Sequence, residues 1–215
     1  MIIKKHKIVN LIEQGEGLHL DFKFEVSDPA KIARSLASFA NTEGGKLLIG
    51  VEDNGKISGI KSEEEYYMVE NSASKYCDPK VNFTSKEWII TGKKVLEVNI
   101  TKSGTAPHRT PDNNGKLRAY IRVHDQNILA NGIQMKIWKK LADNKDIKLV
   151  YSDDVSILLE IFRNNNSLLL SQLILMLDLS KFKIENILAE LIIMNIIKMN
   201  VSEFDSSFSL CDPTE

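Results

Sequence analysis

The residues best suited to binding or catalysis lie between Phe39 and Ile60, where three glycines, a lysine and an acidic turn occur close together. Gly44-Gly45-Lys46 follows an apolar stretch, and an exposed glycine hinge can present backbone N–H groups to a phosphate. A P-loop needs G-x-x-x-x-G-K-[ST], but Lys46 is followed by Leu47 and no earlier glycine stands at the required distance. The glycines are therefore assigned first to a helix end and a tight entry into a strand. A nucleotide (ATP)-binding module remains the weakest alternative.

The acidic turn in the same stretch is Asp53-Asn54-Gly55, a sequence typical of a tight hairpin. Gly50 interrupts the apolar run before it, which indicates that another backbone segment or a ligand comes close. Aspartate is a common turn former because it bonds its own backbone. The carboxylate of Asp53 can serve the turn or a reaction, and the residues alone leave both readings open.

Other catalytic chemistries have little support. His108 has no evident Ser or Cys partner, and the two cysteines, Cys77 and Cys211, lie far apart in the sequence. They form neither a disulfide framework nor a zinc pattern, which favours a reducing compartment. The N-terminus lacks the apolar core of a signal peptide, and the apolar runs are far short of a membrane span. We therefore expect a cytoplasmic protein with no membrane partner.

Charge divides the chain into two parts. Residues 151–215 carry 4 basic and 10 acidic residues, a net charge of −6, whereas residues 1–150 carry 24 basic and 19 acidic residues, a net charge of +5. This asymmetry indicates two domains with different partners. A charge of +5 over 150 residues is too mild to establish nucleic-acid binding by itself.

The elements of the first part are mixed without a regular βαβ rhythm, which favours an α+β domain. Leu18–Phe24 alternates as a half-buried strand does, and Asp28-Pro29 is a typical helix start. The nearly continuous apolar run of Lys46–Glu52 predicts a central strand covered on both faces. Further helices are predicted at 5–13, 63–76 and 129–142, further strands at 81–83, 87–91, 95–100 and 117–123, and a polar loop at 102–116.

The second part has a different pattern. Amphipathic helices are predicted at 155–162, 168–177 and 181–194, followed by short strands at 196–201 and 206–210. Three helices and a two-stranded ribbon in about 60 residues are typical of a winged helix-turn-helix. We therefore predict two domains, residues 1–146 and residues 150–215.

Four segments within residues 10–135 resemble, in the right order, the motifs of the Schlafen AlbA-like domain family, also described as a divergent AAA domain. They are Glu16–Lys23 (EGLHLDFK), Phe39–Ile60, Pro107-His108, and Tyr120–Val123 with Ala130. The resemblance implies a mixed-sheet, nucleic-acid-binding α+β domain. Bacterial members often continue into a winged helix and are described as transcriptional regulators.

The resemblance also implies an enzymatic alternative. Eukaryotic relatives include RNA-cleaving enzymes with three acidic residues on the nucleic-acid face, and the matching positions are Glu16, Asp21 and Asp53; Asp21 stands where those enzymes use Glu. Three carboxylates can hold Mg²⁺ or Mn²⁺ and activate water. Each residue has a structural explanation too, because Glu16 can cap a loop and Asp21 can pair with Lys23 or Lys46. A metal-dependent endoribonuclease thus stays the alternative, and no other cofactor is assigned.

Contact with phosphate is the favoured reading of the basic residues on these segments, mainly through the resemblance. The candidates are Lys23, Lys46, His108, Arg109, Arg118 and Arg122. They would give sequence-independent, salt-sensitive affinity. We predict a DNA-binding transcriptional regulator rather than an enzyme, with DNA favoured over RNA. The acidic second domain is expected to support a homo-oligomer, most simply a dimer.

Overall fold

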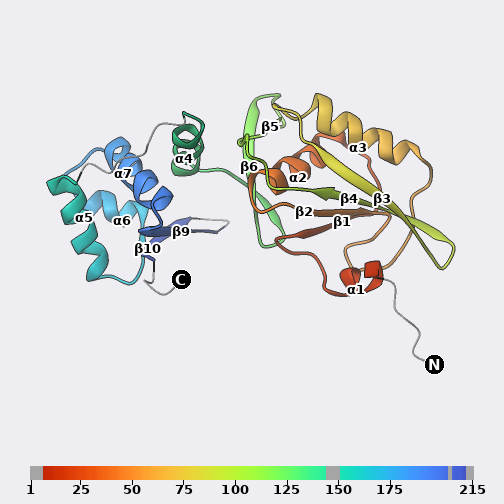
Figure 1. The fold of residues 1–215 in the computed structure, drawn as a ribbon, viewed down its shortest axis with the longest axis horizontal. Helices are drawn as coiled ribbons and strands as arrows, with labels where there is room; N and C mark the ends of the chain where they lie inside the picture. The colour runs from red at the N-terminus through yellow and green to blue at the C-terminus, as the bar shows by residue number, and fades with distance from the viewer. Residues whose placement is uncertain (1–6, 144–150, 203–204, 212–215) are drawn as a thin grey trace. The chain divides into compact units, whose positions relative to one another are not determined.

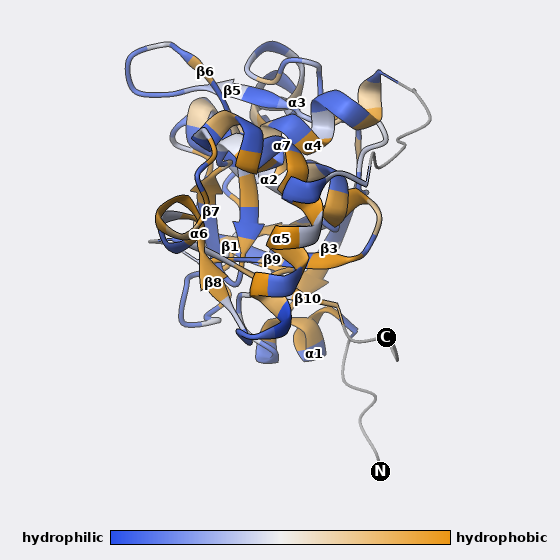
Figure 2. Cartoon of the chain, turned by 90° about the vertical axis from the view of Figure 1, so that its left-hand side faces the viewer, coloured by the Kyte–Doolittle hydropathy of each residue, from blue (hydrophilic) through white to orange (hydrophobic). Residues whose placement is uncertain are grey.

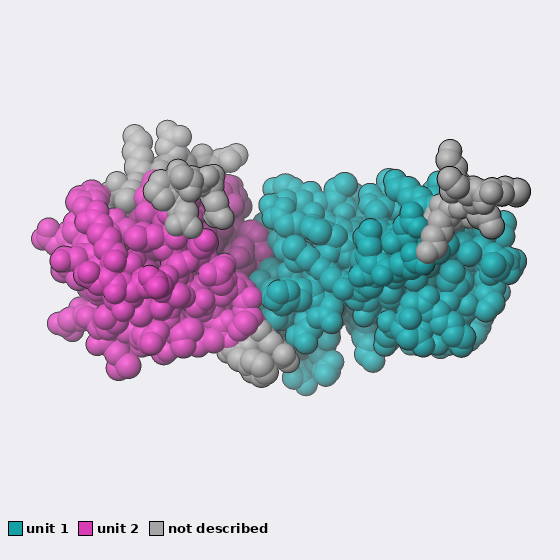
Figure 3. All heavy atoms as spheres, turned by 90° about the horizontal axis from the view of Figure 1, so that it is seen from below, with its two compact units in different colours: residues 1–130 teal, residues 131–215 magenta. Residues whose placement is uncertain are grey.

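The computed structural model describes residues 7–143, 151–202 and 205–211. They form two compact units, residues 1–130 and residues 131–215, which are coloured separately in Figure 3. Both units combine helices with β-sheet, so the predicted α+β class is confirmed. None of the described helices has both the length and the apolar character needed to span a bilayer.

The first unit is built on a mixed four-stranded sheet (Figure 1). Its strands are β1 (Leu20–Lys23), β2 (Gly45–Ile49), β3 (Phe83–Ile90) and β4 (Lys93–Ile100), in the order β1-β2-β4-β3. β1 and β2 are parallel, and the other neighbours are antiparallel. The apolar run in β2 is central as predicted, with Leu47, Leu48 and Ile49 fully buried.

Helices cover both faces of this sheet (Figure 1). Helices α2 (Pro29–Asn41) and α3 (Glu64–Lys75) pack with Leu47, Ile49, Leu96 and Val98 on one face. The short helix α1 (Lys7–Glu13) packs on the other face, where Leu48 and Val95 point because side chains alternate along a strand. The first two residues of the predicted helix 5–13 lie outside the described residues.

The start of α2 follows the predicted pattern. Asp28 is the N-cap, and its side chain accepts hydrogen bonds from the backbone N–H groups of Ala30 and Lys31, while Pro29 occupies the first turn. At the other end, Gly44 has a φ of +74° and donates its N–H to the carbonyl of Phe39. This left-handed residue ends the helix and turns the chain into β2.

A second sheet packs against α2. Its strands are β5 (Arg109–Pro111), β6 (Leu117–Val123) and β7 (Gln126–Leu129), in that order. β5 lies inside the predicted 102–116 loop, and the separate strands predicted at 81–83 and 87–91 are one continuous strand, β3. In both places polar residues conceal the strand: β3 pairs with β4 alone among the named strands, and β5 pairs with β6 and also forms a bridge from Arg109 to Asp78.

The second unit contains four helices and a small sheet among its described residues. The elements are α4 (Gly132–Ala142), α5 (Asp153–Arg163), β8 (Leu168–Leu169), α6 (Leu170–Met176), α7 (Lys181–Ile193), β9 (Ile197–Val201) and β10 (Ser206–Leu210). The sheet order is β8-β10-β9. Its helices carry both polar and apolar residues (Figure 2). The apolar sides of these helices enclose a separate core that includes Leu158, Leu188 and Phe208.

The boundary between the units falls between Ala130 and Asn131, whereas the sequence predicted domains of residues 1–146 and 150–215. Helix α4 belongs to the second unit because Ile133 and Ile137 enter the second core. In addition, Lys140 on α4 forms a 2.8 Å ion pair with Glu190 on α7. The predicted polar linker continues into residues 144–150, which lie outside the described residues.

Candidate nucleic-acid interface

The motif segments of the first unit meet around the buried guanidinium of Arg122, on β6. Its Nε donates to the carbonyl of Gly17, and its Nη2 donates to the carbonyl of Leu20 and to Asp21 Oδ1 at 3.1 and 3.3 Å. Its Nη1 donates to Asn127 Oδ1, and the guanidinium carbon lies 5.0 Å from the centre of the Phe39 ring. The side chain is only 1% exposed. Arg122 therefore holds β1, α2, β6 and β7 together.

This placement corrects the prediction that Arg122 contacts phosphate, because the guanidinium is buried and four of its five N–H donors already bind groups inside the protein. His108 requires the same correction. It is 3% exposed, and its ring nitrogens lie 2.7 Å from the carbonyl of Pro79 and 2.7 Å from Ser103 Oγ. Its backbone N–H donates to Asn41 Oδ1, and the amide of Asn41 donates to the carbonyls of His108 and Tyr120. Sequence reasoning missed this bridging role of Asn41.

The acidic residues of the first motif form a pair with unequal proton affinity. The carboxyls of Glu16 and Asp21 lie close enough to affect each other's ionisation, and Glu16 Oε1 accepts a hydrogen bond from the backbone N–H of Phe22 at 2.7 Å. Burial raises the pKa of Glu16 above its ordinary 4.5, and the nearby Asp21 adds to the rise. Burial opposes ionisation of Asp21 as well, but the positive charges of Lys23 and Arg122 outweigh it and hold the pKa of Asp21 below 3.8.

The third predicted carboxylate, Asp53, does not complete a metal site with this pair. Asp53 is exposed in the turn that follows β2. Among the described residues, no three His, Cys, Asp or Glu side chains are grouped closely enough to hold a metal ion. Asp21 Oδ2 already binds Lys23 Nζ at 2.8 Å and Ser35 Oγ at 3.1 Å. The donor set therefore does not fit a three-carboxylate metal site, and no hydrolytic step is assigned to it.

Acid titration tests the pairing of Asp21. Because folding lowers the pKa of Asp21 below 3.8, its stabilising contribution is present above that value and is lost as the pH falls through the folded pKa. We expect Asp21→Asn to lower the free energy of unfolding by about 2 kcal/mol near neutral pH, and this difference to shrink below about pH 4. Urea unfolding at a series of pH values measures it. The exposed control Asp53→Asn should stay within about 0.5 kcal/mol of the unchanged protein, and a pH-independent Asp21→Asn difference would contradict the pairing.

The other predicted basic residues are accessible to different degrees. Lys23 and Lys46 are half-buried and paired, with Asp21 and with Glu97. Arg118 lies 3.2 Å from Asp112, while Arg109 is exposed and has no acidic partner among the described residues. Arg109 and Arg118 belong to the β5–β6 hairpin, and Lys116 beside them is exposed too. The hairpin is therefore a solvent-facing basic ribbon fixed at its base by the buried Arg122.

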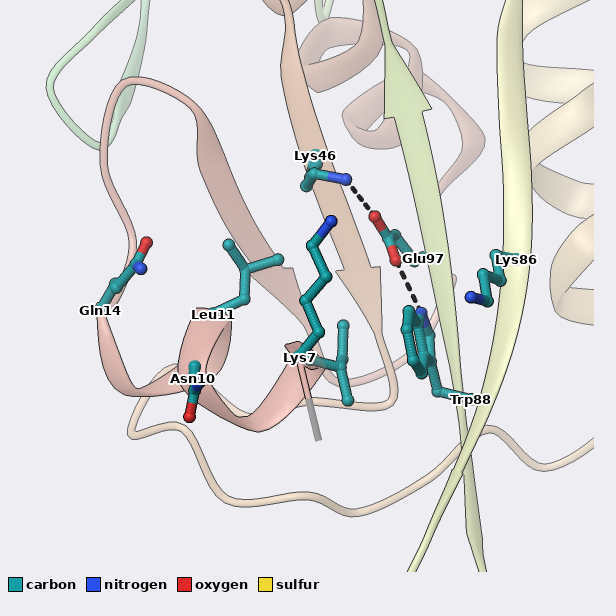
Figure 4. Close-up of a pocket in the computed structure, with 9 residues that line it drawn as sticks. Lys7, Asn10, Leu11, Gln14, Lys46, Lys86, Trp88 and Glu97 are labelled. Atoms are coloured by element: carbon teal, nitrogen blue, oxygen red, sulfur yellow. Dashed lines mark hydrogen bonds and ion pairs between the residues drawn. The ribbon is translucent and has the colours of Figure 1, made fainter. Parts of the chain in front are cut away.

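A cavity of about 310 Å³ opens on the face of the four-stranded sheet that α1 partly covers (Figure 4). At its wall, Glu97 accepts hydrogen bonds from Lys46 Nζ and, at 2.6 Å, from Trp88 Nε1. Burial opposes ionisation of Glu97, but Lys46 and the Trp88 N–H hold its pKa below 4.5. Sequence reasoning missed Glu97 and Trp88. The available signal was a carboxylate in the middle of the apolar run Val95–Ile100.

Comparisons with known proteins agree with the motif content of the first unit. The family model described as Schlafen, AlbA_2 matches residues 16–131. The chain is similar to the DIP2311 protein from Corynebacterium diphtheriae, with 22% identity and a TM-score of 0.44 over 57% of this chain and 27% of that one. It is also similar to the N-terminal domain of a RecG-related protein from Nitrosomonas europaea, with 19% identity and a TM-score of 0.41 over 55% of this chain and 89% of that one. None of the curated proteins matches it.

The family match ends at residue 131, one residue beyond the end of the first compact unit. The matched region contains the Arg122 network, the Glu16–Asp21 pair and the β5–β6 hairpin. It covers more than half of the 215 residues. The chain belongs to the Schlafen AlbA_2 family.

Proposed function

We propose that this chain is a DNA-binding transcriptional regulator whose first unit contacts the phosphate backbone. The observation that carries the proposal is the β5–β6 hairpin, which presents Arg109, Lys116 and Arg118 on a ribbon with a rigid base. Two-stranded ribbons dock into DNA grooves, and basic side chains on them supply salt-sensitive phosphate contacts. The nucleic-acid binding implied by the family resemblance supports the same reading.

For the second unit we propose a winged helix-turn-helix that associates two copies of the chain. The element order α5-β8-α6-α7-β9-β10 supports this, since α6 and α7 make a helix-turn-helix and β9 with β10 a ribbon after it. The charges on α7 argue against a strong role in reading DNA. Lys183 lies 2.5 Å from Asp154, and Lys181 lies 3.9 Å from Glu185, so both lysines have acidic neighbours within the protein.

Fluorescence anisotropy with duplex DNA at increasing salt tests the phosphate contacts. We expect the double variant Arg109→Ala/Lys116→Ala to weaken binding to all sequences and to reduce the slope of log K against log salt by about 2. The matched control is Lys75→Ala/Lys80→Ala, which removes two exposed lysines that likewise lack acidic partners among the described residues. The control should leave the slope unchanged.

Two measurements on the same purified protein, duplex affinity and RNA cleavage, distinguish a regulator from an enzyme. Absence of duplex affinity at low salt, or an equal loss in both double variants, would contradict the proposal. Incubation with structured RNA and Mn²⁺ forms a second arm, compared with Asp53→Ala. Cleavage that disappears in Asp53→Ala would replace the regulator with the endoribonuclease alternative.

A further inference from the structure

The cavity beside α1 is lined by positive charge that the protein leaves partly uncompensated. Lys7, Lys46 and Lys86 line it from α1, β2 and β3, and among the described residues Glu97 is its only lining carboxylate. Lys46 is paired with Glu97, whereas Lys7 and Lys86 form no ion pair with a side chain in the part of the chain that the structure describes. The lining therefore carries an excess of two positive charges.

Hydrogen bonds and a cation–π contact hold the side chains of this cavity wall in place. The carboxylate of Glu97 binds Lys46 with one oxygen and Trp88 Nε1 with the other, so its acceptors are occupied by the wall itself. The ammonium of Lys86 lies 3.8 Å from the centre of the Trp88 ring, a cation–π contact that fixes its direction. Lys7 extends from α1 toward Lys46 and Glu97 (Figure 4).

The opposite wall is one stripe of α1. Lys7, Asn10 and Leu11 lie at positions i, i+3 and i+4 of α1, which share a helix face, and Gln14 follows directly after the helix. Two amides, of Asn10 and Gln14, and the apolar side chain of Leu11 thus contribute to the lining on this side. The cavity thus has a cationic part and a mixed amide and apolar part, and its volume of about 310 Å³ is near the lower end for small-molecule sites.

We propose that this cavity binds a phosphorylated small molecule the size of a mononucleotide, with its phosphate at the three lysines. A phosphate monoester carries a charge of about −1.5 to −2 at neutral pH, which matches the excess of two positive charges. Asparagine and glutamine amides satisfy the polar edges of a base or sugar, while Leu11 and Trp88 offer apolar contact. The site would make the protein responsive to a small metabolite, and it does not depend on the β5–β6 hairpin.

Tryptophan fluorescence provides a direct readout, because the chain has two tryptophans and only Trp88 lines the cavity. In a Trp138→Phe background, titration with ATP or AMP should change the Trp88 emission saturably, and adenosine, which lacks phosphate, should not. Isothermal titration calorimetry on the unmodified protein repeats the measurement without that substitution. Lys7→Gln and Lys86→Gln are each expected to weaken nucleotide affinity about tenfold.

The control Lys75→Gln removes an exposed lysine on α3, which packs on the opposite face of the sheet, and should bind as the unchanged protein does. Three outcomes would overturn the proposal: no saturable binding of ATP or AMP, equal affinity in the Lys7→Gln/Lys86→Gln double variant, or equal loss in Lys75→Gln. A 5′-phosphorylated single-stranded oligonucleotide distinguishes the source of the phosphate. Binding of that strand alone, with no free nucleotide bound, would also overturn the assignment to a small molecule. Retained nucleotide binding in Arg109→Ala/Lys116→Ala separates this site from the proposed DNA contacts.

Discussion

Replacing Arg122 with alanine is expected to lower the free energy of unfolding of the first unit by about 3 to 5 kcal/mol, the usual loss when one partner of a buried ion pair is removed. The side chain is 1% exposed, so water cannot replace it. Its loss leaves the carbonyls of Gly17 and Leu20 without their side-chain donor, and leaves Asp21 with Lys23 as its only cationic partner in the described part of the chain. Because native domains are stable by only about 5 to 15 kcal/mol, this one change removes a large part of the total.

The matched control is Arg118→Ala, on the same strand four residues earlier. Arg118 is 40% exposed, and its one acidic partner, Asp112, accepts at 3.2 Å. Exposed ion pairs contribute about 0 to 1 kcal/mol, so this variant should change the stability little. Urea unfolding followed by Trp88 fluorescence in a Trp138→Phe background isolates the first unit, since two compact units can unfold in separate transitions. Equal losses in the two variants would show that Arg122 does not hold the motif segments together.

Arg118 and Arg122 also show why the sequence predicted the fold better than the site. Both are arginines on the same face of one alternating strand, and nothing in Leu117–Val123 separates them. Their different environments come from Gly17–Asp21 and Asn127, which reach Arg122 only after the chain has folded. Burial of a charged or polar side chain depends on such distant partners, which is why the sequence predicts phosphate contact for both Arg122 and His108.

The sequence correctly predicts the features that depend on residues close together in the chain. Asp28-Pro29 specifies the start of α2 through an N-cap and a fixed φ, and the apolar Leu47–Ile49 run specifies a strand buried on both faces. Strand pairing does not follow from such signals. Thr84–Glu87 is exposed and polar, yet it pairs with β4 throughout. The pairing of β3 and β4 also places Trp88 beside Glu97, nine residues away, and so forms the cavity wall that the sequence did not reveal.

Gly50 is the position where a local signal correctly predicted a long-range contact. Its φ is +91°, its N–H donates to the carbonyl of Lys23 at 2.8 Å, and its carbonyl accepts from the N–H groups of Ser58 and Gly59. A Cβ atom here would lie 2.8 Å from the backbone carbon of Gly59 and 2.8 Å from the nitrogen of Ile60. Gly50, which directly follows β2, therefore marks a close approach of backbone, as its place in an apolar run indicates.

Gly50→Ala should consequently destabilise the first unit by about 3 kcal/mol or more. A left-handed conformation costs an alanine about 1 to 2 kcal/mol, and forcing a methyl group against backbone adds about 1 to 3 kcal/mol. Gly92→Ala separates the two contributions, because Gly92 has a similar φ of +78° but nothing within 4 Å of the added Cβ atom. That variant should lose only the conformational part, about 1 to 2 kcal/mol. If both variants lost the same amount in urea unfolding, the segment from Ser58 to Ile60 would be free to move away, and the close crossing at Gly50 would not constrain the fold.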